Sequence, residues 1–493
     1  MTTELFGIKM NKEPFQHQIT ALEKSKTKAK FAYFCEMGSG KTKMMIDDAA
    51  IMYNNGHIQA LLVLAPKAVY SNWTNNEIPE HMSPSVSYAM NQWISSSSKF
   101  HTKQTEEFVV KKHEGRLSIF IVNIEAINFP KCLTAVSKFI ATHKGNVMIA
   151  LDESTVIKNH EAKRTKKAVK LAEMCKIKRI ATGSPVTNSP LDLYSQCSFL
   201  GKDCLGYGSF YAFRGTYAIM RSMEVGGGRV IQVVDGYKNL DHLAKKLETF
   251  SFRIKKSECM DLPEKIYQVR DVPLTPEQIH LYNDMAQEAI ATYNGSEMSA
   301  SIVLTKLLRL HQIICGCFKD DLGKHHIIPN NRIKVLEDLL DECQGKVIIF
   351  ANYIANIEEI NNLIRGKYGD ESLVNYYGAI PLLERDNAIK RFQRLEDPAR
   401  FFVGNTQTAG KGITLTAASN VIYYSNDYSL ENRLQSEDRA HRAGQKNNVT
   451  YTDLVSKGTV DFKILQALTN KMDIASEIMK DGIQKWIDLT VIS

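Results

Sequence analysis

The sequence lacks any apolar run near the ~20 residues that a helix needs to span a bilayer, and residues 1–14 contain no apolar signal core. Its nine cysteines are an odd number and do not have the paired spacing of a disulfide framework. The closest approach to a metal cluster is Cys315-Gly316-Cys317 with His325 and His326, and Cys-x-Cys is not a usual zinc spacing. These absences predict a soluble intracellular protein with reduced thiols, no membrane contact and no structural zinc.

A strong excess of one charge is also missing. The formal net charge is +8 over 493 residues, with 44% hydrophobic and 24% charged residues, which is the composition of an ordinary globular protein. This moderate basic excess is compatible with a polyanionic partner but does not require one. The length exceeds what one hydrophobic core covers, so we expect two or three domains. The sequence shows no internal repeat of short period.

The first 190 residues alternate short apolar runs with stretches of helical periodicity. The apolar runs lie at 31–35, 60–65, 117–124, 146–151 and 180–182. Runs of this kind are typical of parallel strands that are buried on both faces. Residues 1–190 are therefore predicted to form a doubly wound α/β lobe, in which the functional residues follow the carboxyl ends of the strands.

A second series of apolar runs begins in the last third of the chain. These runs lie at 346–351, 372–377, 400–404, 420–424 and 454–455. They predict a second parallel-sheet lobe over residues 331–493. Residues 191–330 are rich in aromatics and glycines and are interrupted by prolines, so we interpret them as a helical insertion and linker with a domain boundary near residue 265. The predicted class is α/β, with two such lobes in tandem and helical insertions between them.

The segment Cys35–Thr42 has the residues that hold a polyphosphate. It lies between an apolar run and a helical pattern. The glycines of Gly38-Ser39-Gly40 allow backbone N–H groups to point inward, Lys41 can reach the β- and γ-phosphates, and Thr42 can bind Mg²⁺. The N-terminus of the helix favours the same anion. The alternative is a loop and helix without a nucleotide, because Cys35 replaces the first glycine of the general pattern.

An acidic pair follows the apolar run at 146–151. Asp152 can hold Mg²⁺ through water, and Glu153 can polarise the attacking water. Together with Lys41 and Thr42 in the same predicted lobe, this pair favours nucleotide hydrolysis over binding alone. The alternative is that Asp152 or Ser154 caps a surface helix.

Two arginines lie three residues apart in the segment Gln435–Gln445. In a helix, Arg439 and Arg442 would share one face. A guanidinium at this position can stabilise charge on a γ-phosphate that another domain holds. The alternative is a basic helix in which Glu437 and Asp438 are intrahelical partners of the arginines.

In this order, these blocks resemble the motifs of the superfamily 2 nucleic-acid motors, and within them the SWI2/SNF2 ATPases. The first half contains Gln16, similar to the adenine-reading glutamine; Cys35–Thr42, similar to motif I; Pro66-Lys67 with Asn72-Trp73, similar to motif Ia; Asn123-Ile124-Glu125, similar to the next block; Asp152–Thr155, similar to motif II; and Thr182–Pro185, similar to motif III. Members of this superfamily commonly lack the first glycine of motif I, which agrees with Cys35.

The second half contains the remaining blocks. Ile348–Phe350 is similar to motif IV, Thr408–Ala418 to motif V, and Asp438–Gln445 to motif VI, which is the block most specific to the family. Ala409 and Thr414 stand where the family usually has Gly and Asn, and Tyr428-Ser429-Leu430 replaces its Trp-Asn-Pro. The replacement of Trp-Asn-Pro affects how tightly the second lobe is expected to hold its DNA strand, and it leaves the expectation of ATP hydrolysis unchanged.

The resemblance implies two RecA-like lobes that share one ATP and one Mg²⁺, with hydrolysis driving movement along double-stranded DNA. The residues that it implies are Lys41, Asp152, Glu153, Arg439 and Arg442 for catalysis; Gln16, Gly38, Ser39, Gly40, Lys41, Thr42 and Gly412 for ATP; Thr42 and Asp152 for Mg²⁺; and Pro66, Lys67, Asn123, Thr182, Gly410 and Lys411 for nucleic acid.

The resemblance also leaves alternatives open. One is a helicase that separates strands or processes branches in DNA or RNA, and another is a nucleotide-gated module that binds a nucleoprotein with little hydrolysis. We expect a monomer of compact bacterial or phage type that displaces a nucleoprotein complex. Its compartment would be the cytoplasm, or the nucleus if the source is eukaryotic.

Overall fold

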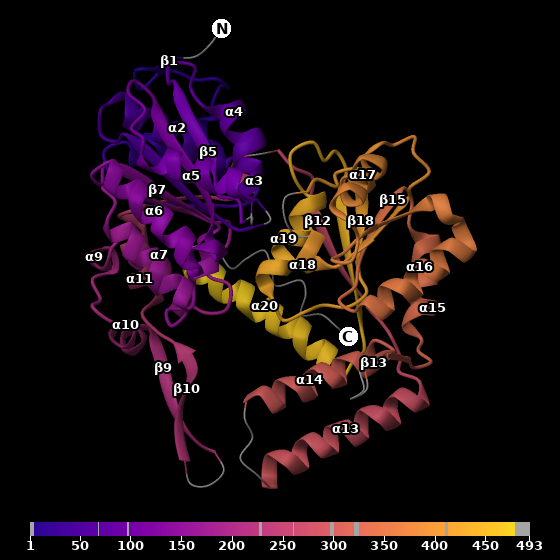
Figure 1. Cartoon of the computed structure of the whole chain (residues 1–493). Coiled ribbons are helices and arrows are strands. Elements are labelled where there is room, and N and C mark those ends of the chain that lie inside the picture. The colour runs from indigo at the N-terminus through magenta and orange to yellow at the C-terminus, as the bar shows by residue number, and fades with distance from the viewer. Residues whose placement is uncertain are drawn as a thin grey trace. The chain divides into compact units, whose positions relative to one another are not determined.

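The computed structural model describes residues 4–67, 69–95, 98–225, 229–259, 261–295, 300–319, 325–409 and 413–478. The chain divides into two compact units (Figure 1). Unit 1 comprises Met1–Ile219, Gly236–Met260 and Ile474–Gly482. Unit 2 comprises Met220–Asp235, Asp261–Asp473 and Ile483–Ser493.

Unit 1 is built on a seven-stranded parallel sheet with the order β11-β3-β8-β7-β4-β6-β5. Its strands are β3 (Lys30–Cys35), β4 (Ala60–Ala65), β5 (Tyr88–Gln92), β6 (Leu117–Asn123), β7 (Val147–Asp152), β8 (Ile177–Ala181) and β11 (Ser251–Ile254). A short antiparallel pair, β1 (Glu4–Leu5) and β2 (Ile8–Lys9), precedes the sheet in the chain. The five predicted apolar runs correspond to β3, β4, β6, β7 and β8.

Helices cover both faces of this sheet, and alternate side chains of β4 show why. Leu62 and Leu64 belong to one buried cluster with residues of α6 and α7, whereas Leu61 and Val63 belong to another with residues of α1 and α2. The helices of unit 1 are α1 (Gln16–Ser25), α2 (Lys41–Asn54), α3 (Tyr70–Asn72), α4 (Ile78–His81), α5 (Lys99–Val110), α6 (Pro130–Thr142), α7 (Lys163–Glu173), α8 (Leu193–Leu200), α9 (Lys202–Leu205), α10 (Phe210–Tyr217), α11 (Leu240–Glu248) and α12 (Lys256–Cys259). Short 3₁₀ turns are η2 (Ile124–Asn128), η3 (Ser154–Ile157) and η4 (Pro190–Asp192), and η1 (Trp73–Glu77) is a π-helical turn. The doubly wound arrangement predicted for this lobe is therefore observed.

The sheet of unit 1 extends beyond the predicted limit at residue 190. β11 pairs in parallel with β3 and forms one edge of the sheet. β5 forms the other edge, and its residues are only half-buried. Sequence periodicity missed both edge strands because short edge strands lack the continuous apolar run of a central strand. The segment Asp261–Asp473 of unit 2 follows Met260 of unit 1, and the domain boundary near residue 265 stays a prediction.

The region predicted as a helical insertion also contains strands. Helices α8 to α11 are present, but β9 (Ala218–Val225) and β10 (Arg229–Tyr237) form a two-stranded hairpin between α10 and α11. Arg221 and Asp235 pair across this hairpin at 3.0 Å. The glycine run at 226–228 lies outside the described residues.

Unit 2 is built on a six-stranded parallel sheet with the order β12-β19-β18-β15-β17-β16. Its strands are β12 (Lys265–Asp271), β15 (Lys346–Phe350), β16 (Leu373–Tyr376), β17 (Phe401–Gly404), β18 (Ala418–Tyr423) and β19 (Val449–Val455). Ile348 and Phe350 face one buried cluster and Val347 and Ile349 the other, so helices again cover both faces. β12 belongs to this sheet, so unit 2 begins well before the expected limit at residue 331.

Helices and a small hairpin complete unit 2. They are α13 (Pro276–Gly295), α14 (Ala300–Ile314), α15 (Arg332–Glu342), α16 (Ile354–Tyr368), α17 (Leu382–Gln393), α18 (Thr406–Ala409), α19 (Leu430–Ala440) and α20 (Val460–Ile478), with the 3₁₀ turn η5 (Asp370–Ser372) and the strands β13 (Cys317–Lys319) and β14 (His325–Ile327). An apolar cluster that includes Ile314 and Ile464 joins α14 to α20.

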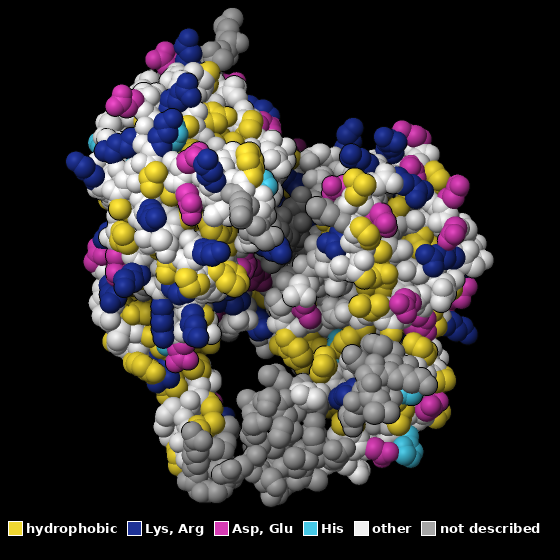
Figure 2. Space-filling view, in the orientation of Figure 1, with side chains coloured by type: hydrophobic (Ala, Val, Ile, Leu, Met, Phe, Trp, Pro, Cys, Tyr) yellow, Lys and Arg dark blue, Asp and Glu magenta, His cyan; other side chains and the backbone are white. Residues whose placement is uncertain are grey.

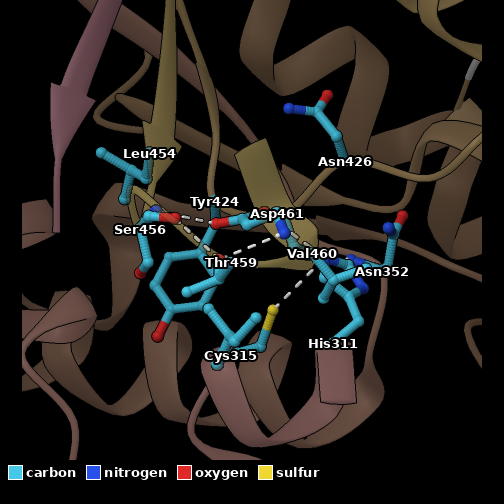
Figure 3. Close-up of polar contacts among 12 residues, drawn as sticks. His311, Cys315, Asn352, Tyr424, Asn426, Leu454, Ser456, Thr459, Val460 and Asp461 are labelled. Atoms are coloured by element: carbon cyan, nitrogen blue, oxygen red, sulfur yellow. Dashed lines mark hydrogen bonds and ion pairs between the residues drawn. The ribbon is translucent and has the colours of Figure 1, made fainter. Parts of the chain in front are cut away.

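A buried ionic cluster ties these outer helices to the sheet (Figure 3). Arg332 forms an ion pair with Asp461 and donates to the backbone oxygens of Tyr424 at 2.6 Å and Leu454 at 2.9 Å. Tyr424 directly follows β18, and Leu454 is the last residue but one of β19. His311 contacts Cys315 at 3.7 Å and Asp461 at 3.5 Å. Burial opposes the charged form of His311, but the neighbouring Cys315 and Asp461 raise its pKa to about 10. The cluster is a closed structural network in which opposite charges compensate one another.

The cysteines predicted to be reduced are unpaired in this structure. Cys315 contacts His311 at 3.7 Å, and Cys317 lies 3.6 Å from the Oδ1 atom of Asn356. Among the described residues, no group of three or more His, Cys, Asp and Glu side chains could hold a metal ion. Within the same residues, none of the helices is both long and apolar enough to cross a membrane.

Candidate functional site

The loop between β3 and α2 has the geometry of an anion-binding turn. Gly38 and Gly40 adopt left-handed backbone angles, with φ of 86° and 84°. The left-handed conformation of Gly40 favours glycine, and a Cβ atom there would lie 2.1 Å from Nε2 of Gln18, so a larger residue would also displace the Gln18 amide from the loop. α2 begins directly after the loop and directs its positive end toward it.

Lys41 is the first residue of α2 and lies within this loop. Its side chain is buried (8% exposed), and Nζ donates to the backbone oxygen of Glu36 at 3.2 Å. The same nitrogen would lie 3.5 Å from a Cβ atom at Gly183, which follows β8. Thr42, the predicted magnesium ligand, is half-buried on the first turn of α2. The loop, Lys41 and the turn after β8 thus meet at one edge of the sheet.

The glutamine that contacts the loop is Gln18, two residues after the predicted Gln16. Gln16 is exposed at the start of α1, whereas Nε2 of Gln18 donates to the backbone oxygen of Ser39 at 3.1 Å. Oε1 of Gln18 accepts from the backbone N–H of Phe15 at 3.1 Å. His17 also contacts the backbone oxygen of Ser39, at 2.8 Å. Because residues two apart lie on different faces of a helix, only one of the two glutamines can reach the loop. The adenine-reading role predicted for Gln16 stays a prediction.

Asp152 ends β7, and both of its carboxylate oxygens accept hydrogen bonds. Oδ2 accepts from Nε1–H of Trp73 at 2.9 Å, and Oδ1 accepts from the backbone N–H of Glu153 at 3.0 Å. Burial raises the pKa of Asp152, while the Trp73 hydrogen bond and the charge of Lys41 act in the opposite direction. The carboxylate is therefore held in one orientation close to the Lys41 ammonium.

Glu153 has an unusual backbone conformation for a residue with a side chain. Its φ of 51° lies in the left-handed region, which costs free energy and is often found at functional sites. Its side chain is half-buried, and Oε2 accepts from the hydroxyl of Thr182 at 3.3 Å. The turns after β7 and β8 thus bring Thr182 to the acidic pair. The alternative of a helix cap does not describe Asp152, whose Oδ2 contacts Trp73 and not the first turn of a helix.

The predicted nucleic-acid contacts of unit 1 differ in accessibility. Lys67 is exposed, and Pro66 before it is buried. Oδ1 of Asn123 accepts from the backbone N–H of Glu125 at 2.7 Å and caps η2. Thr182 is 1% exposed. Among these four, Lys67 has the side chain that a polyanion could reach in this conformation, and the role of all four stays a prediction.

On the face that Figure 2 shows, the surface charge of unit 1 does not mark a nucleic-acid track by itself. On the face that Figure 2 shows, the Lys and Arg side chains of the described residues lie among acidic and hydrophobic ones and form no single stripe. Phosphate contacts depend on local groups and not on net charge. The residues at the strand ends therefore remain the better guide to a nucleic-acid surface.

In unit 2, the two predicted arginines have different environments. Arg439 lies on α19, is buried, and donates to the backbone oxygens of Gln435 at 2.8 Å and Ile413 at 3.0 Å. Arg442 lies beyond the end of α19, is half-buried, and donates to the hydroxyl of Thr414 at 2.8 Å. The prediction that both lie on one helix face is wrong, because α19 ends at Ala440.

A charged network lies inside α19 and the neighbouring strands. Arg433 pairs with Glu437 at 2.8 Å and with Asp453, and Lys265 and the hydroxyl of Tyr267 also contact Glu437, at 3.0 and 2.8 Å. Burial opposes ionisation of Glu437, but Lys265 and Arg433 outweigh it and lower its pKa to about 2. Glu437 thus has an arginine partner on its own helix, as the alternative interpretation held, but that partner is Arg433. The predicted residues Gly410, Lys411 and Gly412 lie outside the described residues.

Comparison with known families agrees with this arrangement of motifs. The SNF2-related domain matches residues 32–319, and the helicase conserved C-terminal domain matches residues 331–444. The chain belongs to the SNF2-related family. The first match covers every strand of the unit 1 sheet except Lys30 and Phe31, the first two residues of β3.

Relatives of this SNF2-related chain come from bacteria and eukaryotes. YwqA of Bacillus subtilis, named as a candidate ATP-dependent helicase/translocase, is 25% identical over 92% of this chain and 46% of its own length. CHR12 of Arabidopsis thaliana, named as a candidate ATP-dependent DNA helicase, is 25% identical over 91% of this chain and 40% of its own length. The chain therefore spans less than half the length of these relatives. A solved SWI2/SNF2 ATPase core of Sulfolobus solfataricus in complex with double-stranded DNA is 24% identical over 98% of this chain and 96% of its own, with a TM-score of 0.41.

Sequence reasoning missed three residues that the structure places at the motifs of this SNF2-related chain. Gln18 and Trp73 lie beside predicted residues and contact the loop and Asp152, and Thr414 contacts Arg442. The signal for Gln18 was its position two residues after Gln16 in the same helix start. Trp73 and Thr414 belong to segments that resemble family motifs, but their partners are 79 and 28 residues away in the chain, so the contacts arise only from folding.

Proposed function

We propose that this chain hydrolyses ATP with Mg²⁺ and couples the turnover to movement along double-stranded DNA. The observation that carries the proposal is the convergence of the glycine loop, Lys41, Asp152 and Glu153 at the carboxyl edge of one parallel sheet. Membership of the SNF2-related family and the names of the relatives support it.

The residues at the loop fit a nucleoside triphosphate and a hard cation. The loop would receive the phosphates with its backbone N–H groups and with the amino end of α2, and Lys41 would contact the β- and γ-phosphates. Thr42 and Asp152 offer hydroxyl and carboxylate oxygens, which are the ligands that Mg²⁺ prefers. When bound, the ion neutralises charge on the phosphates. In this proposal Gln16 and Gly412 remain further ATP contacts.

Hydrolysis requires a group that activates water beside the γ-phosphate. We assign this role to Glu153, which lies next to Asp152 and is partly accessible. The hydroxyl of Thr182 holds one oxygen of Glu153, so the carboxylate has a defined direction. Arg442, together with Arg439, would stabilise the charge of the transferred phosphoryl group. This role rests on the family pattern.

Movement along DNA requires contacts that do not depend on sequence. We propose that Pro66, Lys67, Asn123 and Thr182 of unit 1, with Gly410 and Lys411, meet one strand of the duplex through its phosphates. Coupling would follow from a conformational cycle in which nucleotide binding and release alter the grip on the strand. We further propose that a monomer moves and displaces a nucleoprotein complex in its path.

The test is ATP turnover measured without nucleic acid and with duplex DNA, single-stranded DNA, branched DNA and RNA. Duplex DNA should give the largest stimulation, and Lys67→Ala should reduce it and lower the slope of the salt dependence by about one phosphate contact. Lys103→Ala, which removes an exposed lysine on α5, is the matched control and should behave as the wild type. A turnover rate that no nucleic acid changes would contradict the proposal.

A strand-separating helicase is the second candidate, because one relative is named as a DNA helicase. A duplex with one fluorescent strand and a triplex with a fluorescent third strand distinguish the two. Release of the third strand without separation of the duplex supports translocation, whereas release of the duplex strand supports the helicase. ATP-dependent binding of a nucleoprotein with negligible turnover would instead support a nucleotide-gated module.

A further inference from the structure

Trp73 lies in the chain between Pro66-Lys67 and Asp152, to which the proposed function assigns DNA and Mg²⁺. It is the first residue of η1, a π-helical turn between α3 and α4, and it is 1% exposed. α3 and η1 closely follow the segment Pro66-Lys67 at the carboxyl end of β4. Single π-helical turns are rare and are frequently found at functional sites.

The indole of Trp73 has one polar atom, and that atom is directed at Asp152. Nε1–H donates to Oδ2 at 2.9 Å in a buried contact between residues 79 positions apart. The other oxygen of Asp152 accepts from the backbone N–H of Glu153. The two hydrogen bonds fix the plane of the carboxylate, and Trp73 provides the only side-chain one that the described residues show.

A role for Trp73 in packing alone would explain its burial but not the choice of acceptor. A buried indole N–H needs an acceptor, and a backbone carbonyl would satisfy it without constraining a charged group. Here the acceptor is the carboxylate to which the proposed function assigns Mg²⁺. Partners that orient a metal-binding carboxylate commonly change metal affinity by 10–100-fold when they are removed.

We propose that Trp73 is a positioning residue for the magnesium site: its N–H holds Asp152 in the orientation that the ion requires. This inference rests on the proposed function, since it assumes that Asp152 serves Mg²⁺. It predicts that removal of the N–H alone, with the aromatic ring retained, weakens Mg²⁺ and leaves the phosphate loop intact.

The first test measures ADP binding by calorimetry over a range of Mg²⁺ concentrations. In Trp73→Phe, the Mg²⁺ concentration at half-maximal enhancement of ADP binding should rise about tenfold, while ADP affinity without Mg²⁺ should not change. Trp93→Phe is the matched control, because Nε1 of Trp93 donates to the hydroxyl of Ser95 at 3.3 Å and not to a carboxylate. A folded Trp73→Phe protein with the wild-type Mg²⁺ dependence would overturn the proposal.

The second test leaves residue 73 unchanged and so does not depend on the folding of Trp73→Phe. The chain has three tryptophans, and replacement of Trp93 and Trp486 by Phe leaves Trp73 as the only one. Its emission should change when Mg²⁺ is added to the ADP complex, and this change should disappear in the same background with Asp152→Asn. A Trp73 emission that does not respond to Mg²⁺, although Mg²⁺ strengthens ADP binding, overturns the proposal. If Mg²⁺ has no effect on ADP binding by the wild type, the proposed function itself fails.

Discussion

The carboxyl edge of the unit 1 sheet and the segment around α19 in unit 2 both contain buried charged groups, but they are partnered differently. In unit 1, Lys41 donates to a backbone oxygen, and Asp152 accepts from an indole and a backbone N–H. In unit 2, Arg433 and Glu437 are neutralised by each other and by Asp453 and Lys265. Neutral partners leave a charge able to act on a ligand, whereas an opposite charge at hydrogen-bonding distance commits it to the fold.

The two arginines of the segment that resembles motif VI, Arg439 and Arg442, differ in burial. Arg439 is buried against backbone oxygens and holds α19 to the segment at Ile413. Arg442 lies past the helix, and a hydroxyl group is its side-chain partner. The partners that these hydrogen bonds give both arginines are neutral, so burial is what distinguishes them: we expect the half-buried Arg442 to act on a ligand and the buried Arg439 to contribute to the structure. The predictions below test this division.

The largest effect is expected for Arg442→Ala. Turnover should fall about 10³-fold or more, as for other arginines that stabilise a transferred phosphoryl group, while ATP binding and the unfolding midpoint should change little. Steady-state ATPase assays with duplex DNA and separate nucleotide titrations check this. Arg439→Ala should instead lower stability first, and a folded Arg439→Ala protein that loses turnover while Arg442→Ala keeps it would reverse the assignment.

Glu153→Gln should reduce ATP hydrolysis by about 10²-fold or more and retain ATP binding, because the amide keeps the shape of the side chain but cannot accept a proton. Single-turnover hydrolysis and a filter-binding assay separate the two effects. Glu107→Gln, which neutralises an exposed carboxylate on α5, is the control and should hydrolyse ATP at the wild-type rate. Equal rates for Glu153→Gln and the wild type would remove Glu153 from the chemistry.

Glu437→Gln should lower the free energy of unfolding by about 3–5 kcal/mol, because it leaves the buried Arg433 and the half-buried Lys265 without their full compensation. Glu342→Gln is the matched control: its partner Arg270 is also in unit 2, but the pair is exposed, and such pairs contribute about 1 kcal/mol or less. Urea unfolding, with hydrogen exchange of α19 and β19 amides, measures both. Similar losses in the two variants would show that burial does not distinguish the pairs.

Low pH should reduce the free energy of unfolding of unit 2 by protonating Glu437. The pKa of Glu437 is lowered to about 2 in the folded protein, against an ordinary value of 4.5. The folded state therefore holds the carboxylate ionised, and this stability is present above about pH 4.5 and is lost as the pH falls toward 2. The loss would reach about 3 kcal/mol for this shift. Urea unfolding between pH 6 and 2.5 should show a smaller dependence on pH for Glu437→Gln than for the wild type.

The smallest effect is expected for Thr414→Val. The hydroxyl of Thr414 accepts from Nη1 of Arg442, and removal of this partly exposed hydrogen bond should cost about 1 kcal/mol. If the contact also positions Arg442 for the transition state, turnover should fall about fivefold, which is what a loss of about 1 kcal/mol in transition-state stabilisation produces. Thr416→Val, which removes a hydroxyl two residues away, is the comparison. A larger loss for Thr416→Val would exclude a positioning role for Thr414.

The central strands were predictable because burial on both faces requires apolar residues at every position. β4 is buried throughout, and its apolar run ends at the same residue as the strand. β5 at one edge is half-buried and has no such run, and β9 and β10 form a hairpin apart from either large sheet. β5 depends on pairing with β6, and β9 and β10 pair with each other, so none of these strands needs the continuous apolar run of a strand that is buried on both faces.

The sequence alone determined which residues are candidates for the chemistry: the glycine loop, Lys41, Asp152, Glu153 and Arg442 follow strand ends or stand in segments that resemble family motifs. Only the tertiary structure decided which partners direct them, namely Gln18 against the loop, Trp73 on Asp152, Thr182 on Glu153 and Thr414 on Arg442. The physical reason is that residue type and spacing follow from local backbone geometry, whereas each of these hydrogen bonds joins segments that come together only when the parallel strands are ordered in the sheet.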